Sequence, residues 1–346
     1  MTTTAMQRVR VELGDRSYDV LIGPGVRHRL AEQVARTGAR RAVVVSARPA
    51  GWTPDPGVPH LVLSAEDGEA GKTLSVVERY CRRFAQFGLS RTDVVVAVGG
   101  GSTTDTAGLA AALYHRGVPV IHLPTTLLAQ VDASVGGKTG ANLPEGKNLV
   151  GAYWQPRAVL CDTDYLATLS AAELRSGYGE IARCHFIGAG DLRGRSHTEQ
   201  IAASVRRKAE LVSADERESS GRRHLLNYGH TLGHALEVGT GFTLRHGEAV
   251  AIGTVFAGRL AGHLGRITPE RVAEHAEVVA HYGLSGRLPS GVDPAALLAL
   301  MRRDKKATTG LTFVLDGPRG AETVTDVPES AVAAVLAAMP RAESES

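Results

Sequence analysis

The sequence is poor in the features that mark several classes of protein. Only three of its 346 residues are cysteine, aromatic residues make up 5%, and 39 lysines and arginines nearly balance 36 aspartates and glutamates. Cys81, Cys161 and Cys184 are odd in number and form no CxxC pair, so we expect no disulfide framework, no cysteine zinc site and a cytoplasmic location. The small net charge argues against a nucleic-acid partner. No apolar run approaches the ~18 residues that a membrane span needs.

Short apolar runs alternate with helical patterns in the first half of the chain. Gln7–Leu13 and Ser17–Ile22 alternate with period two around Gly14–Asp15, which predicts a hairpin. Continuous apolar runs predict strands buried on both faces of a parallel sheet, at Arg41–Ser46, His60–Leu63, Asp93–Val98, Val118–Leu123 and Ala158–Cys161. Helices are expected between them, notably over Ser75–Phe87 and Asp105–Tyr114. This alternation predicts an α/β domain with a doubly wound, mainly parallel sheet.

The second half is different in character. Helical periodicity dominates from Ala171 to about Tyr282, followed by an expected strand at Leu311–Leu315 and a final helix at Pro328–Met339. The sequence therefore predicts an α/β domain over residues 1–165, a mostly helical domain over 166–340, and a disordered polar tail over 341–346.

A glycine-rich loop follows one predicted strand. Asp93–Val98 runs into Gly99, Gly100 and Gly101, and a helix follows, which Asp105 is expected to cap. Such a loop brings backbone N–H groups and a helix N-terminus close to a phosphate. The alternative is a tight turn that binds nothing. Because the loop is not GxGxxG, a standard Rossmann dehydrogenase is disfavoured.

Polar residues follow the next predicted strand. Thr125 and Thr126 come at its end, where open α/β sheets bind ligands, and Asp132, Lys138 and Lys147 follow in glycine-rich segments. Two lysines beside an aspartate indicate an anionic ligand. The alternative is that both lysines are solvated surface residues.

Histidines cluster in the helical half. His230 and His234 are four residues apart, so they share one face of a helix, and His246 lies beyond a glycine-containing turn from which it can fold back. Zinc takes about three nitrogen or oxygen ligands in catalytic sites, and Glu180 is the best candidate for a carboxylate ligand. The alternative is a set of structural or surface histidines. HxxxH lacks the glutamate of HExxH, so a zinc protease is not indicated.

Taken together, these motifs resemble the sugar phosphate cyclases, and specifically the 3-dehydroquinate synthase branch. The resemblance extends from about Val9 to Met339. It is carried by GGGSTTD, LPTTLLAQVDASVGGKTGANLPEGKNLVGAYWQP, LLNYGHTLGHALE, HGEAVAIG and DKK. It implies a tightly held NAD in the first domain, and one divalent metal, zinc or alternatively cobalt or iron, in the second, which would also bind substrate.

The resemblance also implies roles for individual residues. The NAD-binding residues would be Glu69, Lys72, Gly100, Gly101, Asp105, Thr125, Thr126, Leu128, Asp132, Lys138 and Lys147. The metal ligands would be Glu180, His230 and His246. The substrate pocket would include Asp132, Lys138, Asn148, Arg183, Lys208, Arg223, Asn227, His234 and Lys306. Arg116 would reach the site of a neighbouring subunit, which implies a homodimer.

The implied reaction is the closure of a seven-carbon keto-acid sugar phosphate into a dehydroquinate-type ring. NAD would accept a hydride and return it within one turnover, and inorganic phosphate would leave. Lysine, arginine, asparagine and histidine side chains suit a substrate that carries a phosphate and a carboxylate.

The sequence departs from the resemblance in three places. Arg183 stands where plain 3-dehydroquinate synthases usually have lysine, and a planar guanidinium is not interchangeable with a compact ammonium. The segment from Glu180 to Lys208 is also shorter than usual, and Ser46-Ala47-Arg48 lacks a common acidic or amide residue. The first two departures are typical of amino-dehydroquinate synthases of the aminoshikimate route to 3-amino-5-hydroxybenzoate, the ansamycin starter unit. Their substrate carries an amine in place of a metal-proximal hydroxyl.

Three alternatives to this hypothesis stay open. The chain could be a 3-dehydroquinate synthase of the shikimate pathway. A metal-dependent polyol dehydrogenase shares GGGS-x-x-D and a histidine metal site, but it does not need the full set of lysines and arginines. A non-catalytic homologue is the third, although every expected ligand and pocket position is filled.

Overall fold

The chain forms two compact units, each discontinuous along the sequence. The computed structural model describes residues 5–66, 68–304 and 310–343. The first unit is bounded by Met1–Ser170 and Ser196–Arg217, and the second by Ala171–Arg195 and Glu218–Ser346. The sequence suggested one boundary near residue 165. The difference is α5 (His197–Ala214), which comes after the second unit has begun but packs on β1 and β2 of the first.

The first unit is built on a seven-stranded sheet in the order β1-β2-β9-β6-β5-β3-β4. Only the β1–β2 pair is antiparallel, and it is the hairpin that the sequence predicts. The strands are β1 (Gln7–Val11), β2 (Tyr18–Gly23), β3 (Ala42–Ser46), β4 (His60–Ser64), β5 (Val94–Gly99), β6 (Val120–Pro124) and β9 (Ala158–Asp162). The predicted fold class is confirmed.

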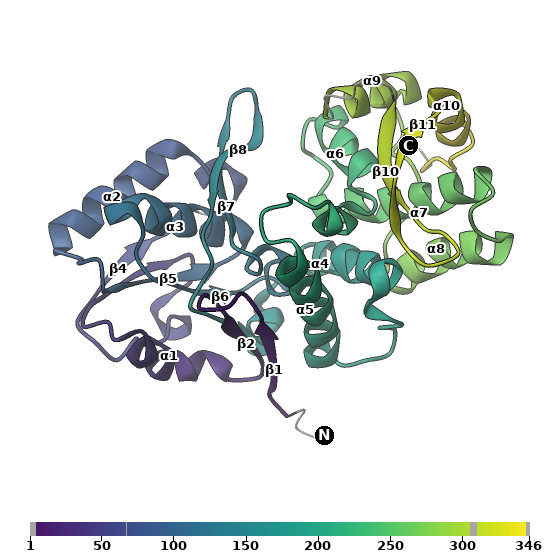
Figure 1. Cartoon of the computed structure of the whole chain (residues 1–346). Coiled ribbons are helices and arrows are strands. Elements are labelled where there is room, and N and C mark those ends of the chain that lie inside the picture. The colour runs from purple at the N-terminus through teal and green to yellow at the C-terminus, as the bar shows by residue number, and fades with distance from the viewer. Residues whose placement is uncertain (1–4, 67, 305–309, 344–346) are drawn as a thin grey trace. The chain divides into compact units, whose positions relative to one another are not determined.

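Helices cover both faces of this sheet, which explains why its central strands are continuously apolar. On one face, α2 (Leu74–Phe87) and α3 (Gly101–Leu113) pack on Val43, Val45 and Val95. On the other, α1 (Leu30–Thr37) packs on Val44, Val94 and Val96. Figure 1 shows α2 and α3 on the side of the sheet opposite to α1.

A second, two-stranded sheet of this unit was not predicted. β7 (Lys138–Leu143) and β8 (Gly146–Tyr153) form an antiparallel hairpin that projects beyond the large sheet in Figure 1. Its sequence is rich in glycine, asparagine and lysine, which are depleted in strands, so propensity alone indicates a loop. Short helical turns complete the unit: η1 (Val26–Arg29), η2 (Ala50–Trp52), η3 (Glu69–Gly71), η4 (Tyr114–Arg116), η5 (Ala129–Ala133) and η6 (Thr163–Thr168).

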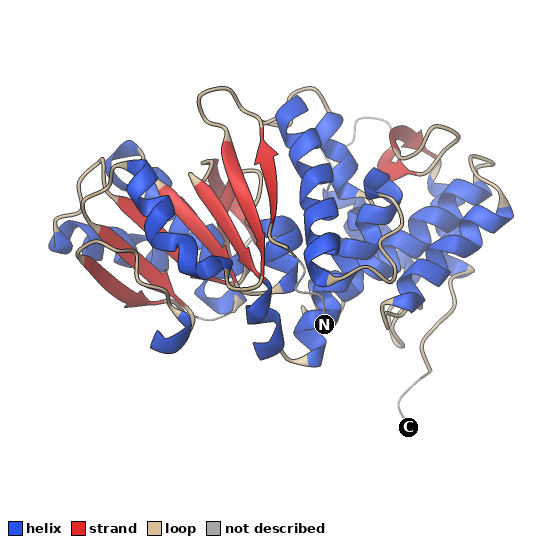
Figure 2. Ribbon diagram, turned by 90° about the horizontal axis from the view of Figure 1, so that it is seen from below, coloured by secondary structure: helices blue, strands red, loops and turns tan. Residues whose placement is uncertain are grey.

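The second unit is mainly helical, as predicted, and Figure 2 shows how helices dominate it. Its helices are α4 (Ala171–Cys184), η7 (His185–Ala189), η8 (Arg222–Asn227), α6 (His230–Gly239), α7 (His246–His263), α8 (Pro269–His281), α9 (Pro294–Asp304) and α10 (Glu329–Ala337). The expected strand is β10 (Leu311–Leu315), and it pairs with an unpredicted partner, β11 (Glu322–Val327). Within the described part of the chain, no helix is long and apolar enough to cross a membrane.

The end of the described chain is held by hydrogen bonds. Ala342 N donates to Leu288 O at 2.8 Å, and Arg341 Nη1 donates to Val292 O at 3.1 Å. Arg341 and Ala342, which were expected in a disordered tail, therefore form ordered contacts. Residues 344–346 lie outside the described residues.

Glycines allow α7 to approach its neighbours very closely. A Cβ atom on Gly247 would lie 1.7 Å from Ser176 O of α4, and one on Gly179 would lie 2.0 Å from Gly247 O. Further along α7, a Cβ on Gly253 would lie 1.9 Å from Gly229 O. Real Cβ atoms do not approach backbone oxygens so closely, so only glycine permits these helix crossings.

We predict that Gly247→Ala destabilises the protein by about 3 kcal/mol or more, because the added methyl group meets rigid backbone rather than a movable side chain. Gly233→Ala in α6 is the matched control, since its Cβ would find its nearest atoms at 3.4 Å. Alanine is favoured over glycine inside a helix by about 1 kcal/mol, so the control should be neutral or stabilising. Urea unfolding of both variants measures the difference, and equal stabilities would contradict the prediction.

Candidate functional site

The glycine loop of the first unit lies at the carboxyl end of β5. Gly100 is the N-cap of α3, and Thr104 N donates to Gly100 O at 3.0 Å, which closes the first turn. The sequence prediction that Asp105 caps this helix is wrong, because α3 already begins at Gly101. The N–H groups of the first turn have no partner within a helix and are available to an anion. A Cβ on Gly100 would lie 3.2 Å from Thr126 Cγ2, so glycine keeps this approach open.

Asp105 instead belongs to a cluster of charges beside the loop. Lys72 Nζ lies 2.5 Å from Asp105 Oδ2, and both side chains are largely buried. Burial raises the pKa of Asp105, and the ammonium of Lys72 opposes this shift. Glu69 accepts hydrogen bonds from Asn142 Nδ2 at 2.6 Å and from Ser102 Oγ at 3.4 Å. The structure thus brings Glu69, Lys72 and Asp105, which are all expected to contact NAD, to one end of α3.

The neighbouring strand end contributes a second charged pair. Lys208 Nζ, from α5, lies 2.9 Å from Asp132 Oδ1 and donates to Asp132 O at 2.7 Å. Asp132 lies in η5, two turns beyond Thr125 and Thr126, which follow β6, and just after Leu128. Thr125 N donates to Gly99 O at 2.9 Å, so the two loops are tied together. Asp132 therefore fixes the ammonium group of a lysine that lies 76 positions further along the sequence.

The remaining candidates of this unit lie on its surface. Lys138 begins β7 and is exposed, and Lys147 lies on β8. Asn148, also exposed, has a φ of 58° and its N donates to Asn142 Oδ1 at 2.9 Å. Arg116 is exposed at the end of η4, where φ is 62°. These positions are compatible with ligand binding, and the roles of these residues stay predictions.

The second unit brings the expected metal ligands together. Glu180 lies in α4, His230 begins α6 and His246 begins α7. Glu180 Oε1 is 3.1 Å from His246 Nε2 and 3.5 Å from His230 Nε2. One ligand atom from each residue lies within 4.8 Å of the other two. Glu180 is fully buried, whereas 31% of the His246 side chain is exposed, so the cluster is open on one side.

Glycines next to the ligands produce this convergence. Gly179 precedes Glu180 and Gly247 follows His246, and these two glycines form the crossing of α4 and α7. Gly229 precedes His230 and packs against Gly253 in the middle of α7. The same close backbone contacts that build the helical unit therefore place its three candidate ligands.

The charges around the cluster favour a cation. Burial would raise the pKa of Glu180, but the charges of Arg183 and His230 hold it well below its usual value. Burial favours a neutral His246, but hydrogen bonds with Glu180 and Glu237 outweigh it and raise the pKa of His246 to about 10. Burial lowers the pKa of His230. The site thus draws a proton onto His246, and the same field would stabilise a divalent ion.

Two contacts that the sequence did not reveal fix the histidine rings. His246 Nδ1 lies 3.1 Å from Glu237 Oε2, and His230 Nδ1 lies 3.1 Å from Tyr228 O. Each ring therefore uses Nδ1 on the protein and turns Nε2 toward Glu180. This arrangement is typical of histidines that bind metals. With two imidazole nitrogens and one carboxylate oxygen, the donor set fits zinc or cobalt.

Arg183 occupies the other side of the ligand carboxylate. Its side chain is only 1% exposed, and Nε lies 2.5 Å from Glu180 Oε2. Nη1 donates to Leu226 O, in the segment that leads into α6. Arg183 thus engages one carboxylate oxygen and leaves Oε1 directed at the two imidazoles.

Other expected substrate residues of the second unit lie in η8 and α6. Arg223 and Asn227 lie in η8, and Arg223 is fully buried, with Nε 3.7 Å from Glu218 Oε1. The His234 ring is exposed, and its centroid is 5.3 Å from that of His230. Lys306 lies outside the described residues.

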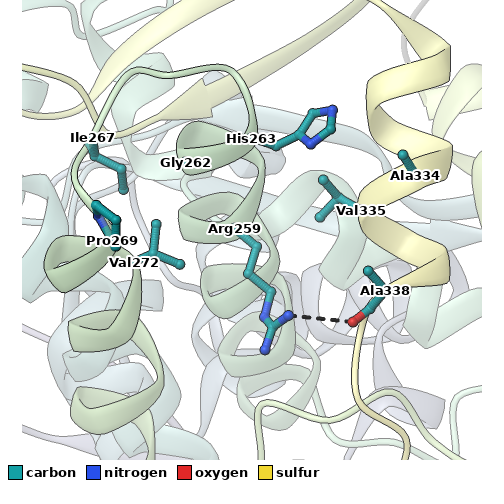
Figure 3. Close-up of a pocket in the computed structure, with 9 residues that line it drawn as sticks. All are labelled: Arg259, Gly262, His263, Ile267, Pro269, Val272, Ala334, Val335 and Ala338. Atoms are coloured by element: carbon teal, nitrogen blue, oxygen red, sulfur yellow. Dashed lines mark hydrogen bonds between the residues drawn. The ribbon is translucent and has the colours of Figure 1, made fainter.

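A pocket of about 610 Å³ lies elsewhere in the second unit, between α7, α8 and α10 (Figure 3). Its walls include Ile267, Val272 and Val335, and Arg259 Nη1 donates to Ala338 O at 3.4 Å. None of the predicted site residues lines it, and it is not the candidate site.

Comparisons with known proteins agree with this geometry. The chain matches the family models described as 3-dehydroquinate synthase N-terminal, over residues 62–176, and 3-dehydroquinate synthase C-terminal, over residues 177–307. It is 70% identical to a protein of Amycolatopsis mediterranei named "Putative aminodehydroquinate synthase", over 96% of this chain and 95% of that protein. It is 45% identical to a 3-dehydroquinate synthase of Nitrobacter winogradskyi, over 89% of each.

Solved structures show the same fold. A 2-deoxy-scyllo-inosose synthase complexed with carbaglucose-6-phosphate, NAD+ and Co2+ matches with a TM-score of 0.86 and 25% identity, over 96% of this chain and 100% of that one. A 2-epi-5-epi-valiolone synthase of Streptomyces hygroscopicus, with NAD+ and Zn2+ bound, matches with a TM-score of 0.76 and 27% identity, over 98% and 99%. By its matches to both family models and to these relatives, the chain belongs to the 3-dehydroquinate synthase family.

Proposed function

We propose that this chain is a lyase that closes an open seven-carbon keto-acid phosphate into a dehydroquinate-type ring and releases inorganic phosphate, with NAD and one divalent metal as cofactors. The observation that carries the proposal is the convergence of Glu180, His230 and His246, with both Nδ1 atoms already engaged by the protein. The bound NAD+ and Co2+ or Zn2+ of the related cyclases support the choice of cofactors.

We assign NAD binding to the first unit and metal binding to the second. The glycine loop and the N-terminus of α3 suit the phosphates of NAD, and Glu69, Lys72 and Asp105 lie beside them. When bound, the metal supplies Lewis acidity and NAD supplies a reversible acceptor for hydride.

Fixed cationic and polar side chains would orient the substrate. Asp132 holds the Lys208 ammonium, so the ammonium is placed before a phosphate or carboxylate arrives. Buried Arg223 offers a planar fork of donors that matches either anion. We assign Lys138, Asn148, Asn227, His234 and Lys306 to the same task on the basis of the sequence motifs.

We further propose that the substrate carries an amine in place of one hydroxyl near the metal. The 70% identity to a protein named as an aminodehydroquinate synthase supports this, and so does Arg183. A guanidinium fixed against Glu180 keeps the positive charge of a lysine but changes its shape and its hydrogen-bond donors beside the candidate metal site, where the two substrates differ. The alternative is a 3-dehydroquinate synthase, which the 45% identical relative favours. A polyol dehydrogenase has less support, since a probable glycerol dehydrogenase shares the fold at only 18% identity.

We also propose that the protein works as a homodimer in which Arg116 reaches the partner's site. Its exposed position in a left-handed turn is compatible with such a contact. A cytoplasmic location belongs to the same proposal and is supported by the low cysteine content, three residues that form no CxxC pair.

The first test is a paired assay with the amino and hydroxy forms of the seven-carbon phosphate. We expect kcat/KM for the amino form to be at least about tenfold higher, which corresponds to about 1.4 kcal/mol in the transition state. Arg183→Lys should lower the ratio of kcat/KM for the amino form to kcat/KM for the hydroxy form. Phosphate release, mass spectrometry of the ring product and absorbance of NADH are measured together. A preference for the hydroxy form would identify a 3-dehydroquinate synthase, and stoichiometric NADH formation would identify a dehydrogenase.

The second test removes the metal. Dialysis against a chelator should lower phosphate release by about a thousandfold, since a Lewis acid contributes several kcal/mol to such a step. One equivalent of zinc or cobalt per chain should restore it. His246→Ala should no longer retain the ion, whereas His263→Ala at the other end of α7 should retain it. Full activity in a verified metal-free sample would refute the metal requirement.

The third test addresses the dimer. Arg116→Ala and His246→Ala should each be nearly inactive alone. If Arg116 acts in the partner's site, mixed dimers contain one complete site, so co-expression of the two variants should restore activity well above either parent. Dimers without restored activity would show that Arg116 acts within its own chain or has no role.

A further inference from the structure

Helix α6 presents a third polar residue on the face that carries His230 and His234. Glu237 follows them at the spacing i, i+4, i+7, which places all three on one side of a helix. Its side chain is only 7% exposed, although it carries a carboxylate. Burying a carboxylate is costly unless hydrogen bonds or charges compensate, so its position calls for an explanation.

One compensating contact is with a predicted metal ligand. Glu237 Oε2 lies 3.1 Å from His246 Nδ1, while His246 Nε2 lies 3.1 Å from Glu180 Oε1. The His246 ring therefore bridges two carboxylates from two different helices, α6 and α4. His230 differs, because its Nδ1 lies against a neutral backbone carbonyl, Tyr228 O.

We infer that Glu237 is a positioning residue for the metal site. This inference rests on the proposed function. Glu237 accepts a hydrogen bond from Nδ1–H of His246, which would make the lone pair of Nε2, on the side of Glu180, the one that a metal binds. A carboxylate acceptor also makes the ring a stronger donor than a carbonyl would. His246 would then be the more strongly held of the two imidazoles, and Glu237 would act on the metal without touching it.

The position of His246 on its helix explains why such a partner is needed. His246 is the first residue of α7, and its side chain is more exposed than that of His230, at 31% against 12%. A partly exposed ring can rotate and present either nitrogen. Glu237 removes this freedom, because it holds Nδ1 on the side away from Glu180.

The test compares Glu237→Ala, Glu237→Gln and a matched control, Glu248→Gln. Glu248 also lies in the first turn of α7, two residues from His246, but its Oε2 accepts a hydrogen bond from Arg245 N at 3.4 Å. Loss of one negative charge near the site is therefore common to both glutamine variants. Zinc affinity is measured by competition with a chromophoric chelator, and the site is probed by the visible spectrum of the Co2+-loaded protein.

Glu237→Ala should weaken zinc binding by about 10- to 100-fold, the usual cost of losing such an outer partner. Glu237→Gln should lose less zinc affinity, because its amide oxygen can still accept a hydrogen bond from Nδ1–H of His246. Glu248→Gln should bind zinc within about threefold of the wild type, since it leaves the outer partner in place. Long-range 15N–1H spectra of the zinc-loaded protein should show His246 protonated on Nδ1, and in Glu237→Ala this proton should exchange faster.

Two results would overturn the inference: wild-type affinity in Glu237→Ala, or the same loss in Glu248→Gln as in Glu237→Ala. Thermal unfolding of the metal-free variants separates misfolding from a local effect. If Glu237→Ala does not fold, Glu237→Gln still tests the inference, through its zinc affinity in the chelator competition and through the visible spectrum of its Co2+-loaded form. If the wild type itself binds no zinc or cobalt, the proposed function fails first, and that outcome is distinct from a selective loss in the Glu237 variants.

Discussion

The close contact of α7 with α4 and with the segment before α6 determines the candidate site. The three candidate ligands come from three helices, and each lies next to a glycine at a backbone crossing: Glu180 beside Gly179, His230 beside Gly229 and His246 beside Gly247. Because these crossings involve backbone atoms, the positions of the ligands depend on the packing of the unit and not on a bound ion. A metal would thus find a largely formed site, which lowers the cost of ordering its ligands.

The burial of charged side chains at this site costs free energy, which the packing of the unit must offset. Glu180 is fully buried beside Arg183, and Glu237 is almost fully buried beside His246. Buried ion pairs contribute little to stability on balance, because desolvation consumes much of the attraction. Two carboxylates and one guanidinium leave an excess of negative charge around the imidazoles, which favours either a proton on His246 or a divalent cation at the site. The arrangement is therefore better explained by function than by folding.

Much of the fold and of the candidate site could be predicted from local sequence patterns. The rest depends on contacts between residues that are distant in the sequence. The valine-rich runs predict the parallel sheet because both faces are buried. The histidine cluster and a carboxylate predict a metal site because the chemistry needs those donors, but the choice of His246 over His234 came from the family resemblance. Glu237 was missed although its spacing from His230 and His234 placed it on their face, since nothing in the sequence shows that His246 lies opposite. The β7–β8 hairpin was missed because its composition favours a loop. The membership of α5 in the first unit depends on its packing on β1 and β2, which local patterns do not encode.

The choice of substrate must come from side chains, because the scaffold is shared. The 2-deoxy-scyllo-inosose synthase has the same fold, with a TM-score of 0.86 at only 25% identity, and its name gives a product other than a dehydroquinate. The same backbone therefore serves more than one substrate. Among the described residues of the ligand cluster, Arg183 is the charged side chain that touches Glu180 without being a ligand candidate itself. Its fork spans Glu180 and the carbonyl of Leu226, which a lysine with a single nitrogen would satisfy differently. An exchange of lysine and arginine at this position alters the shape and the donors next to the candidate metal site while it leaves the charge and the glycine crossings intact, so a shared fold could in this way change its preference between an amine and a hydroxyl.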